Sequence, residues 1–592
     1  MADIKTLSAM AGEDGYAGQN PKEPETSDAE KKLWDWLEDL ASESARVRRE
    51  EGDFDDYDEF LDLFYGKHWP TTIPSFRPPV VVNELRTLIL SEASDLTESQ
   101  LRIYITKDPR NGKRDEQLER AFRAVWARQH IDMEVMKACV WALICGTGFI
   151  EVGWDPDEHH GFGDVFVRCR DPRTVLPDPD ALDDKTWLYR CIEEVLDIHE
   201  IRRLYPVNGM RVTPDDRWSV KDGGHPEAPS SPIYVGPLTP SDTYLQPLNH
   251  GYKKARARIV DVILRDDTVE EVMVSAEDFG ADTSLDSKVA EIIGEEGQQE
   301  FRTELRAKYP HGRRIVGANG VILFDGPNPH PGGDFGLVRV VLEPTPDRFW
   351  GHGFVQQTAE LQLAADKLAS NVVENAVRLN NGIVVSTTNT GLDWETFAGI
   401  PAQIVQINPG SEFKIQYPPP MPPDMIEAPW RMLDMQRRLL GFQASRAGEQ
   451  SRGNVSAELT ETEISQSQSV TRLRARMIHG VVQRLAEMIF ARMAFGYTQA
   501  RAIPAVDGEQ FKPVTWEPLQ DPERYAVHVD PASFTIMSRT MLRRMSLLLR
   551  KLNVIDRRAV LEAVGWPDAA EVAKRMDDSE AAAALAKGGK KK

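Results

Sequence analysis

The sequence predicts an α+β protein that contains unusually long helices. Residues 354–379 include no Gly and no Pro, and their apolar positions recur every three or four residues, which is the periodicity of a helix. A second long stretch with helical character covers 456–495, interrupted only by a glycine at 480. Short segments such as FIEVGW at 149–154 and RARIVDVILRD at 256–266 are instead typical of strands.

The charge balance limits what the protein can bind tightly. The 592 residues include 71 Lys and Arg against 93 Asp and Glu, which gives a formal net charge of −22. A protein that grips nucleic acid phosphates over a large area is usually basic. Tight, sequence-reading DNA binding is therefore disfavoured, whereas a surface that DNA passes without sticking is compatible with this charge.

The four cysteines, Cys139, Cys145, Cys169 and Cys191, lack the C-x2-4-C pairs of a zinc site. We expect buried free thiols, as in a reducing compartment. Residues 1–27 are polar and rich in Gly, Pro and Glu, so they are expected to form a mobile arm and not a secretory signal. The longest apolar run, at 138–150, is shorter than the about 20 residues that span a bilayer. We expect a soluble chain that is cytoplasmic when made.

Helices dominate the first part of the chain. An amphipathic helix is expected to begin at Ser27 or Asp28, and a second apolar series with helical spacing ends at Gly66. Further helices are expected from about Asn83 and over 114–145, with a strand between them at 101–105.

A hairpin is expected next, with strands at 149–154 and 164–169. Its turn holds three acids and two histidines, but a flexible turn does not supply the fixed ligand cluster that a metal needs, so no metal site is predicted. A strand over 187–192 and a short helix that ends near Pro206 follow. Residues 207–251 are rich in Pro, Gly, Asp and Ser and are predicted to be an irregular linker.

Residues 256–343 are predicted to form a small α+β module. Strands are expected at 256–266 and 269–275, followed by a charged helix over 284–308. A hairpin over 313–325 turns at Asn319-Gly320, a dipeptide that favours tight hairpin turns. A last strand at 337–342 leads to the aromatic and glycine-rich FWGHG that opens the helix of 354–379.

The remaining chain combines short strands with helices. Strands in 382–389 and 401–410 and a polyproline spacer at 418–423 lead to a helix from about Met425 to Leu440. A small, charged loop at 445–453 precedes the helix of 456–495. A strand pair at 514–516 and 526–529, helices at 538–551, 556–563 and 568–576, and an Ala/Gly/Lys tail complete the chain.

No enzyme motif stands out. The sequence has no G-x-x-x-x-G-K-[ST], no G-x-S-x-G, no H-E-x-x-H and no protein-kinase set. Gly146-x-Gly148 precedes a strand and lacks the third glycine of a dinucleotide fingerprint. We therefore expect neither an enzyme nor a cofactor.

Four segments, in order, resemble the portal (head-to-tail connector) proteins of tailed bacteriophages. They are Gly146-x-Gly148 with FIEVGWDP and CRDPRTVLPDPDA, the excursion 256–343, the glycine-led FWGHGFVQQTAELQLAADKLASN, and RAGEQSRGNVSAELTETEI with the later SRTMLRRMSLLLRKLNVID. The resemblance covers about residues 50–580.

The resemblance implies a ring, usually of twelve copies, at one capsid vertex, with wing, stem, clip and crown regions around a channel for double-stranded DNA. It implies a first wing part over 28–255, a clip over 256–343, a stem helix over 344–380, a wing return over 381–499 and a crown over 500–592. No second stem helix is identified before residue 256. The implied partners are the packaging ATPase (terminase), major capsid and scaffolding proteins, and head-completion or tail adaptor proteins. The implied location is the virion.

Three groups of residues follow as candidate sites. The loop 445–453 would face DNA, and Lys367 and Arg378 would be sparse positive points on the stem helix. For the loop arginines the alternative is a solvated surface turn, and for Lys367 and Arg378 it is pairing four residues away on the helix, such as Arg378 with Glu374. The loop candidates are Arg446, Glu449, Gln450 and Arg452, and the clip candidates for partner binding are Arg313, Arg314 and Asn319.

The leading hypothesis is a non-enzymatic conduit for DNA and a hub for assembly. The alternatives are another structural virion protein, such as a coat or tail adaptor, and a hydrolase with an unrecognised site.

Overall fold

The computed structural model describes most of the chain between residues 27 and 552. The described ranges are 27–51, 56–69, 79–97, 103–107, 114–215, 255–275, 301–380, 383–386, 412–416, 420–442, 469–507, 510–519, 524–529 and 539–552, with a few isolated positions besides.

Within these ranges the protein is a mixture of helices and antiparallel strands, which confirms the predicted α+β class. The main helices are α2 (Asp28–Glu51), α3 (Tyr57–Tyr65), α4 (Glu84–Thr97), α5 (Glu116–Arg128), α6 (Ile131–Cys145), α7 (Glu158–Gly161), α8 (Ile198–Leu204), α9 (Phe354–Asn380), α10 (Pro423–Leu439), α12 (Ser469–Gly496) and α13 (Arg539–Lys551). The strands are β1 (Ile103–Thr106), β2 (Thr147–Asp155), β3 (Asp164–Arg170), β4 (Val175–Pro177), β5 (Tyr189–Asp197), β6 (Arg256–Leu264), β7 (Val269–Ser275), β8 (Phe301–Ala307), β9 (Arg313–Ala318), β10 (Val321–Pro327), β11 (Leu337–Val341), β12 (Ile383–Ser386), β13 (Phe413–Gln416), β14 (Arg501–Asp507), β15 (Gln510–Trp516) and β16 (Ala526–Val529).

The largest core lies around the sheet β11-β2-β3. Helix α6 packs on this sheet together with the second half of α12, and α3, α4 and α5 complete the cluster. Ile144, Val152, Val340 and Ile489 are all nearly or fully buried there. The apolar segment that ends at Cys145 is thus a core helix, and the cysteines are free thiols, three of them buried, as expected.

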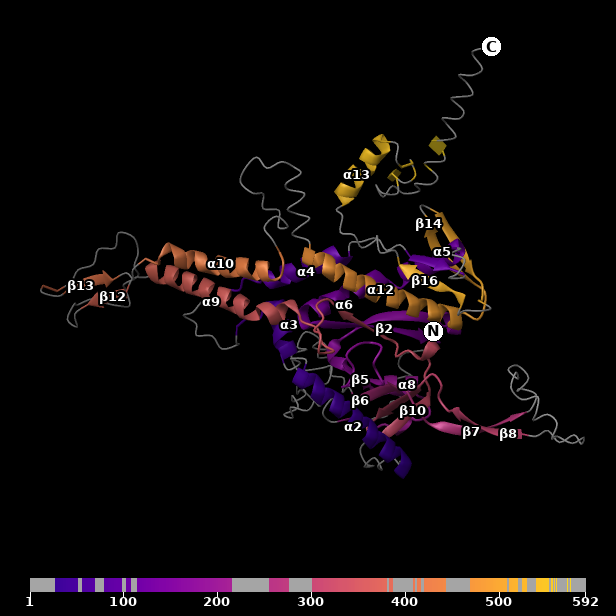
Figure 1. Cartoon of the computed structure of the whole chain (residues 1–592). Helices are drawn as coiled ribbons and strands as arrows, with labels where there is room; N and C mark the ends of the chain where they lie inside the picture. The colour runs from indigo at the N-terminus through magenta and orange to yellow at the C-terminus, as the bar shows by residue number, and fades with distance from the viewer. Residues whose placement is uncertain are drawn as a thin grey trace, which may run out of the picture.

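A five-stranded sheet, ordered β10-β9-β6-β5-β4, forms a second body that α2 covers (Figure 1). Helix α2 starts with a capping box, because the Ser27 hydroxyl accepts from Glu30 N and the Glu30 carboxylate accepts from Ser27 N, both at 3.2 Å. At the other end of α2 the buried Arg48 donates to the carbonyls of Arg173 and Val175. These bonds fix the helix to the turn that precedes β4.

The sheets correct two expectations for 256–343. Strand β6 pairs with β5 along nine residues and β11 pairs with β2, so this segment shares both sheets with the part of the chain before it. The charged helix expected over 284–308 is wrong at its C-terminal end, because 301–307 form strand β8, paired with β7. The turn of the β9–β10 hairpin is confirmed: Asn319 and Gly320 both have positive φ, at 44° and 81°.

Two other expectations about elements also change. The single helix expected over 114–145 is broken into α5 and α6 at His130, which has a left-handed φ of 50°. Strands β15 and β16 do not pair with each other. Instead β15 pairs with β14, and β16 pairs with β1, which lies more than four hundred residues earlier in the chain.

Helix α9 and helix α10 lie side by side and project from the body as a long antiparallel pair (Figure 1). Strands β12 and β13 form a small hairpin-like ladder at the far end of this pair. At about 1.5 Å per residue the 27 residues of α9 extend about 40 Å. In the described structure α9 therefore packs along α10, which follows it in the chain.

Candidate stem and channel surfaces

The base of α9 is fixed by the carboxylate of Asp366. The His68 ring donates from Nδ1 to Asp366, and Val82 N donates to the same carboxylate at 2.9 Å. Gln362, one turn earlier, adds a weaker contact at 3.3 Å. Both the His68 and the Asp366 side chains are fully buried. The buried Asp366 carboxylate thus holds α9 against two segments. These are 66–69, through His68, and 79–83, through Val82.

A close crossing of backbones sets the direction in which α9 leaves the body. A Cβ on Gly146 would lie 1.9 Å from the carbonyl oxygen of Gly351, and one on Gly353 would lie 2.3 Å from that of Ile144. Gly146 also has a φ of +83°, which favours glycine. The two glycine motifs of the sequence therefore lie against each other, and α9 starts where they meet.

One face of α9 is exposed and polar. Gln357, Glu360, Lys367 and Asn371 are exposed and recur three, four or seven residues apart, so they lie on one side of the helix. The predicted site residue Lys367 belongs to this stripe, and no ion pair joins it to another described residue. Arg378 lies in the last turn of α9, and its side chain is outside the described structure.

Helix α10 exposes large apolar side chains on both flanks. Its buried stripe includes Leu433 and Gln436, and Gln436 approaches Thr358 of α9 at 3.4 Å. With 3.6 residues per turn, two groups of apolar residues lie on opposite sides of that stripe. They are Ile426 and Trp430 on one side, 48% and 62% exposed, and Met435 and Leu439 on the other, 53% and 62% exposed.

Between these flanks the outer side of α10 is a charged ridge. Arg431 pairs with Glu427 at 3.1 Å, and Asp434 lies 3.4 Å from Arg437, which also pairs with Glu84 of α4. The sequence contains a signal for this arrangement that the sequence analysis missed. Within 425–440, apolar residues lie on more than one side of the predicted helix, whereas a single buried stripe requires them on one side only.

Arg474 joins α12 to the ends of three other segments. Its guanidinium pairs with the buried Glu92 of α4 at 2.9 Å and also with Glu343, and it donates to the carbonyl of Leu440 at 3.3 Å. The guanidinium also lies 4.5 Å above the ring of Phe354. The starts of α9 and α12 and the end of α10 therefore meet at a single side chain.

The other predicted site residues divide into two groups. Arg446, Glu449, Gln450 and Arg452 lie outside the described residues. Arg313 pairs with Asp325 at 2.7 Å and Arg314 with Asp261 at 2.9 Å, and the Asn319 amide donates to the Thr213 carbonyl at 2.8 Å. These three side chains hold their own sheet together, and their role in partner binding stays a prediction.

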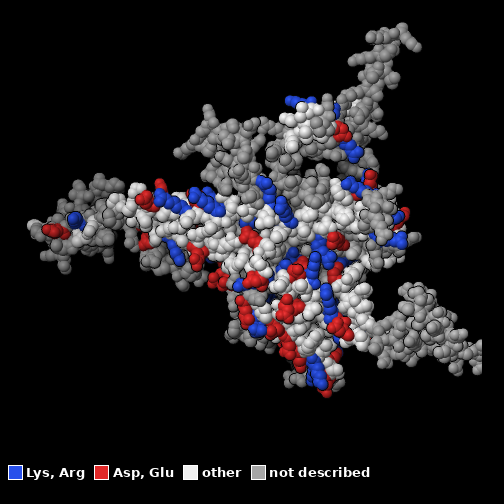
Figure 2. Space-filling view, viewed as in Figure 1, with Lys and Arg blue, Asp and Glu red and all other residues white. Residues whose placement is uncertain are grey.

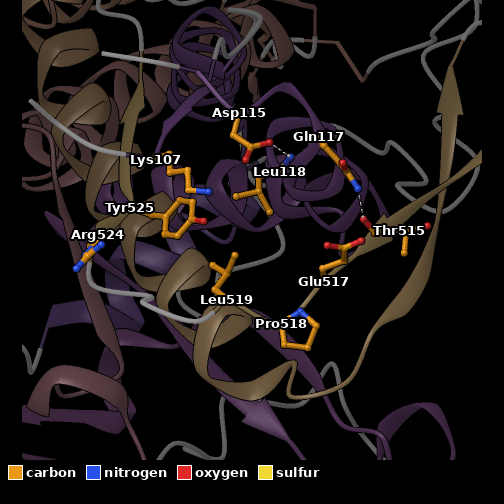
Figure 3. A pocket seen from close by; sticks show the side chains of 10 residues that line it. All are labelled: Lys107, Asp115, Gln117, Leu118, Thr515, Glu517, Pro518, Leu519, Arg524 and Tyr525. Atoms are coloured by element: carbon orange, nitrogen blue, oxygen red, sulfur yellow. Dashed lines mark hydrogen bonds between the residues drawn. The ribbon is translucent and has the colours of Figure 1, made fainter. Parts of the chain in front are cut away.

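A polar hollow of about 460 Å³ lies between α5 and the loop after β15 (Figure 3). Its charges are of both signs, from Lys107, Arg524, Asp115 and Glu517. Two of its lining groups already have structural partners: Asp115 caps α5 by accepting from Leu118 N, and Gln117 donates to the Thr515 carbonyl. We see no convergent catalytic arrangement in it.

The described residues offer neither a metal site nor a membrane span. They contain no group of three or more His, Cys, Asp and Glu side chains placed to hold a metal ion. None of their helices combines the length and the apolar character needed to cross a membrane.

A long projecting helix pair with apolar side chains exposed on both flanks of α10 is typical of a protein that packs against other protein surfaces. Comparison with protein families identifies which one: the model of the phage P22-like portal protein family matches residues 49–589. The chain belongs to that family. Its function is therefore that of a phage portal protein, a structural, capsid-associated component of an oligomeric ring that handles DNA. No curated protein matches the chain.

Proposed function

We propose that this chain is one of about twelve identical subunits that form a ring at a unique capsid vertex. Double-stranded DNA would be packaged through the ring and later leave through it. In this arrangement the α9–α10 pair of each subunit is one segment of the stem, and each pair packs against the pairs of the two neighbouring copies. The wing and crown regions would contact the major capsid and scaffolding proteins.

The observation that carries this proposal is the exposure of apolar residues on both flanks of α10. A closed ring built from identical subunits uses heterologous contacts, so each subunit needs two different surfaces, one for each neighbour. Ile426 and Trp430 offer one apolar surface, and Met435 and Leu439 offer the other. Fully burying an exposed apolar side chain contributes about 1.5–3 kcal/mol, so completing the burial of these half-exposed ones contributes roughly half of that each.

We propose a different position for the clip, because α9 and α10 are antiparallel neighbours. The family resemblance implies that the clip is an excursion between two passes of the chain. The segment between the two stem helices is 381–422, and its described strands β12 and β13 lie at the far end of the pair (Figure 1). We therefore assign the clip to 381–422 in place of 256–343. We also assign to it the docking of the packaging ATPase and, later, of head-completion or tail adaptor proteins.

DNA would pass this lining without being held firmly. Each phosphate contact releases counterions and strengthens binding, so many of them would resist sliding. The net charge of −22 per copy disfavours such contacts, while Lys367 on the exposed stripe of α9 supplies an isolated positive point. Arg378 and the loop 445–453 remain the other proposed DNA-facing positions.

Replacement of Trp430 tests the ring contact. We expect Trp430→Ser to shift the protein from rings to monomers, because a half-exposed side chain of the monomer becomes buried only in the ring. Mass photometry and negative-stain electron microscopy measure the distribution. The matched control is Trp36→Ser on α2, where the tryptophan is 42% exposed and lies away from the stem. Unchanged rings with Trp430→Ser would contradict the assignment of this flank, and monomers of the unmodified protein under every assembly condition would contradict the ring itself.

A further inference from the structure

One exposed face of α12 carries residues that lower the stability of the helix. Arg472 and Arg476 are exposed and four residues apart, a like-charge spacing that destabilises a helix by about 0.2–0.5 kcal/mol. Gly480 follows after another four residues, and a helix-interior glycine costs about 1 kcal/mol relative to alanine. Local features that cost stability are expected at functional sites.

Packing within the subunit does not explain Gly480. A Cβ built on this residue would meet no atom within 4 Å in the described structure, so no described neighbour requires a glycine here. The missing side chain instead leaves the helix backbone open to close approach by something outside the subunit. Arg484 lies one turn further along on the same face, and its contact with Glu487 is long, at 3.6 Å.

A further arginine comes from the end of α10. The carbonyl of Leu440 accepts from Arg474, which ties the end of α10 to the start of α12. Arg438 is exposed on the outer side of α10, two residues before Leu440, and it has no ion-pair partner among the described residues. The same holds for Arg476. Figure 2 shows Lys and Arg side chains along the outer side of α10 and over the first turns of α12.

We propose that the exposed face of α12 that carries Arg476, Gly480 and Arg484, together with Arg438 near the end of α10, binds the phosphodiester backbone of double-stranded DNA. Guanidinium groups donate paired hydrogen bonds to phosphate oxygens, and they read no sequence when they do so. Gly480 lets a DNA strand approach the helix between Arg476 and Arg484. This inference rests on the proposed function as a DNA conduit and adds positions at the described ends of α10 and α12.

The sign of the charge favours DNA as the occupant over an apolar partner. A cluster of arginines is unusual on a chain with a net charge of −22, because most of its surface repels phosphates. Arginines limited to one surface would contact DNA at a single level of the channel and leave the rest of the lining repulsive. An acidic surface on a neighbouring copy is the alternative occupant, and the experiment includes it as an outcome.

The test compares assembled rings of the unmodified protein with rings of Arg438→Gln/Arg476→Gln. The matched control is Arg120→Gln/Arg203→Gln, which removes two exposed arginines from α5 and α8 and so changes the net charge equally. Binding of a labelled linear duplex is followed by fluorescence anisotropy over a salt series. The logarithm of the affinity falls with the logarithm of the salt concentration by about 0.9 for each phosphate contact, so we expect a shallower slope for the first variant only.

Gly480→Leu is a second variant, chosen because leucine is a good helix former and the site has space for it. We expect it to form rings and to bind the duplex at least tenfold more weakly, because its side chain blocks the approach of the DNA backbone. Salt slopes and affinities equal to those of the control would overturn the proposal. So would a loss of rings in place of a loss of DNA binding, since it would assign the surface to a neighbouring copy.

A genome-packaging assay distinguishes a failure of this inference from a failure of the proposed function. If unmodified rings support packaging and both variants package equally well, the DNA-binding surface is wrong and the conduit stands. If unmodified rings support no packaging, the proposed function itself fails.

Discussion

At the scale of single residues, His68 shows how the protein holds a charge in its interior. Its Nδ1 faces the Asp366 carboxylate, and its Nε2 lies 2.8 Å from the Leu63 carbonyl oxygen. A neutral imidazole would direct a lone pair at one of these two acceptors, so the geometry requires both nitrogens to donate. Burial alone would lower the pKa of His68, but the hydrogen bonds to Asp366 and Leu63 outweigh it and raise that pKa above its ordinary value.

This pair predicts a pH dependence of stability. A raised pKa in the folded state stabilises the protein fully below the unfolded value of about 6.5, and the effect is lost as the pH rises through the folded value. We expect the thermal midpoint to fall between pH 6 and pH 9 in the unmodified protein. Asp366 is the titratable group that faces the ring, and its carboxylate also accepts from Val82 N and Gln362.

His68→Gln should remove that dependence and lower stability at pH 6 by about 3–5 kcal/mol, since it leaves a buried carboxylate without its counter-charge. Scanning calorimetry at several pH values measures both effects. His199→Gln, at an exposed position of α8, is the control and should keep the slope of the unmodified protein. A His68→Gln variant with the unmodified slope would show that His68 is neutral in the folded state.

At the scale of elements, the crossing of the two glycine motifs decides where α9 projects. The carbonyl of Gly351 lies where a side chain of residue 146 would be, and Gly351 N donates to the Thr147 hydroxyl at 3.0 Å. Strand β2 and helix α9 therefore start from a shared point. Any displacement there would be carried along the about 40 Å of α9.

Gly146→Ala tests this crossing. The left-handed φ costs about 1–2 kcal/mol for a residue with a Cβ, and the clash with Gly351 adds about 1–3 kcal/mol. Gly161→Ala is the control, because its φ is also positive, at 88°, yet a Cβ there meets nothing within 4 Å. Chemical denaturation should show the larger loss for Gly146→Ala. Equal losses would mean that backbone strain, and not the crossing, accounts for the effect.

Elements with strong local signals could be predicted from the sequence, and their pairing across the chain could not. The periodicity of α9 and the Asn319-Gly320 turn are local properties, and the structure confirms both. The pairing of β16 with β1 depends on a contact between distant segments that no local pattern encodes. The 301–307 segment was expected to be helical because it is charged, but its register with β7 makes it a strand.

The candidate site residues divide in the same way, into features that follow from local spacing and features that depend on tertiary contacts. Lys367 was predicted as a positive point on the helix of 354–379, and the structure places it on an exposed stripe of α9, while its contact with DNA stays a prediction. The partner helix α10 was predicted as a helix but not as the neighbour of α9, since antiparallel pairing is a tertiary contact. Arg313, Arg314 and Asn319 appeared available in the sequence, and only the structure shows the acids and the carbonyl that occupy them.

At the scale of the whole molecule, assembly brings together copies that repel one another. Each subunit carries a net charge of −22, and the proposed contact between neighbours is apolar, through the flanks of α10. Salt screens the repulsion, because the Debye length falls from about 30 Å at 0.01 M to about 8 Å at 0.15 M ionic strength. The apolar contact is not weakened by the same change.

We therefore expect ring formation to strengthen as ionic strength rises from 0.01 to 0.15 M, while duplex binding to the finished ring weakens over the same range. Mass photometry at a fixed protein concentration follows the first effect, and anisotropy follows the second. Trp430→Ser should form fewer rings at every salt concentration but respond to salt in the same direction, because the substitution leaves the charge unchanged. If rings instead dissociate as salt is added, ion pairs and not the apolar flanks of α10 hold the subunits together. The contact would then have to be sought among the charged residues of the ridge on α10, starting with Arg431 and Asp434.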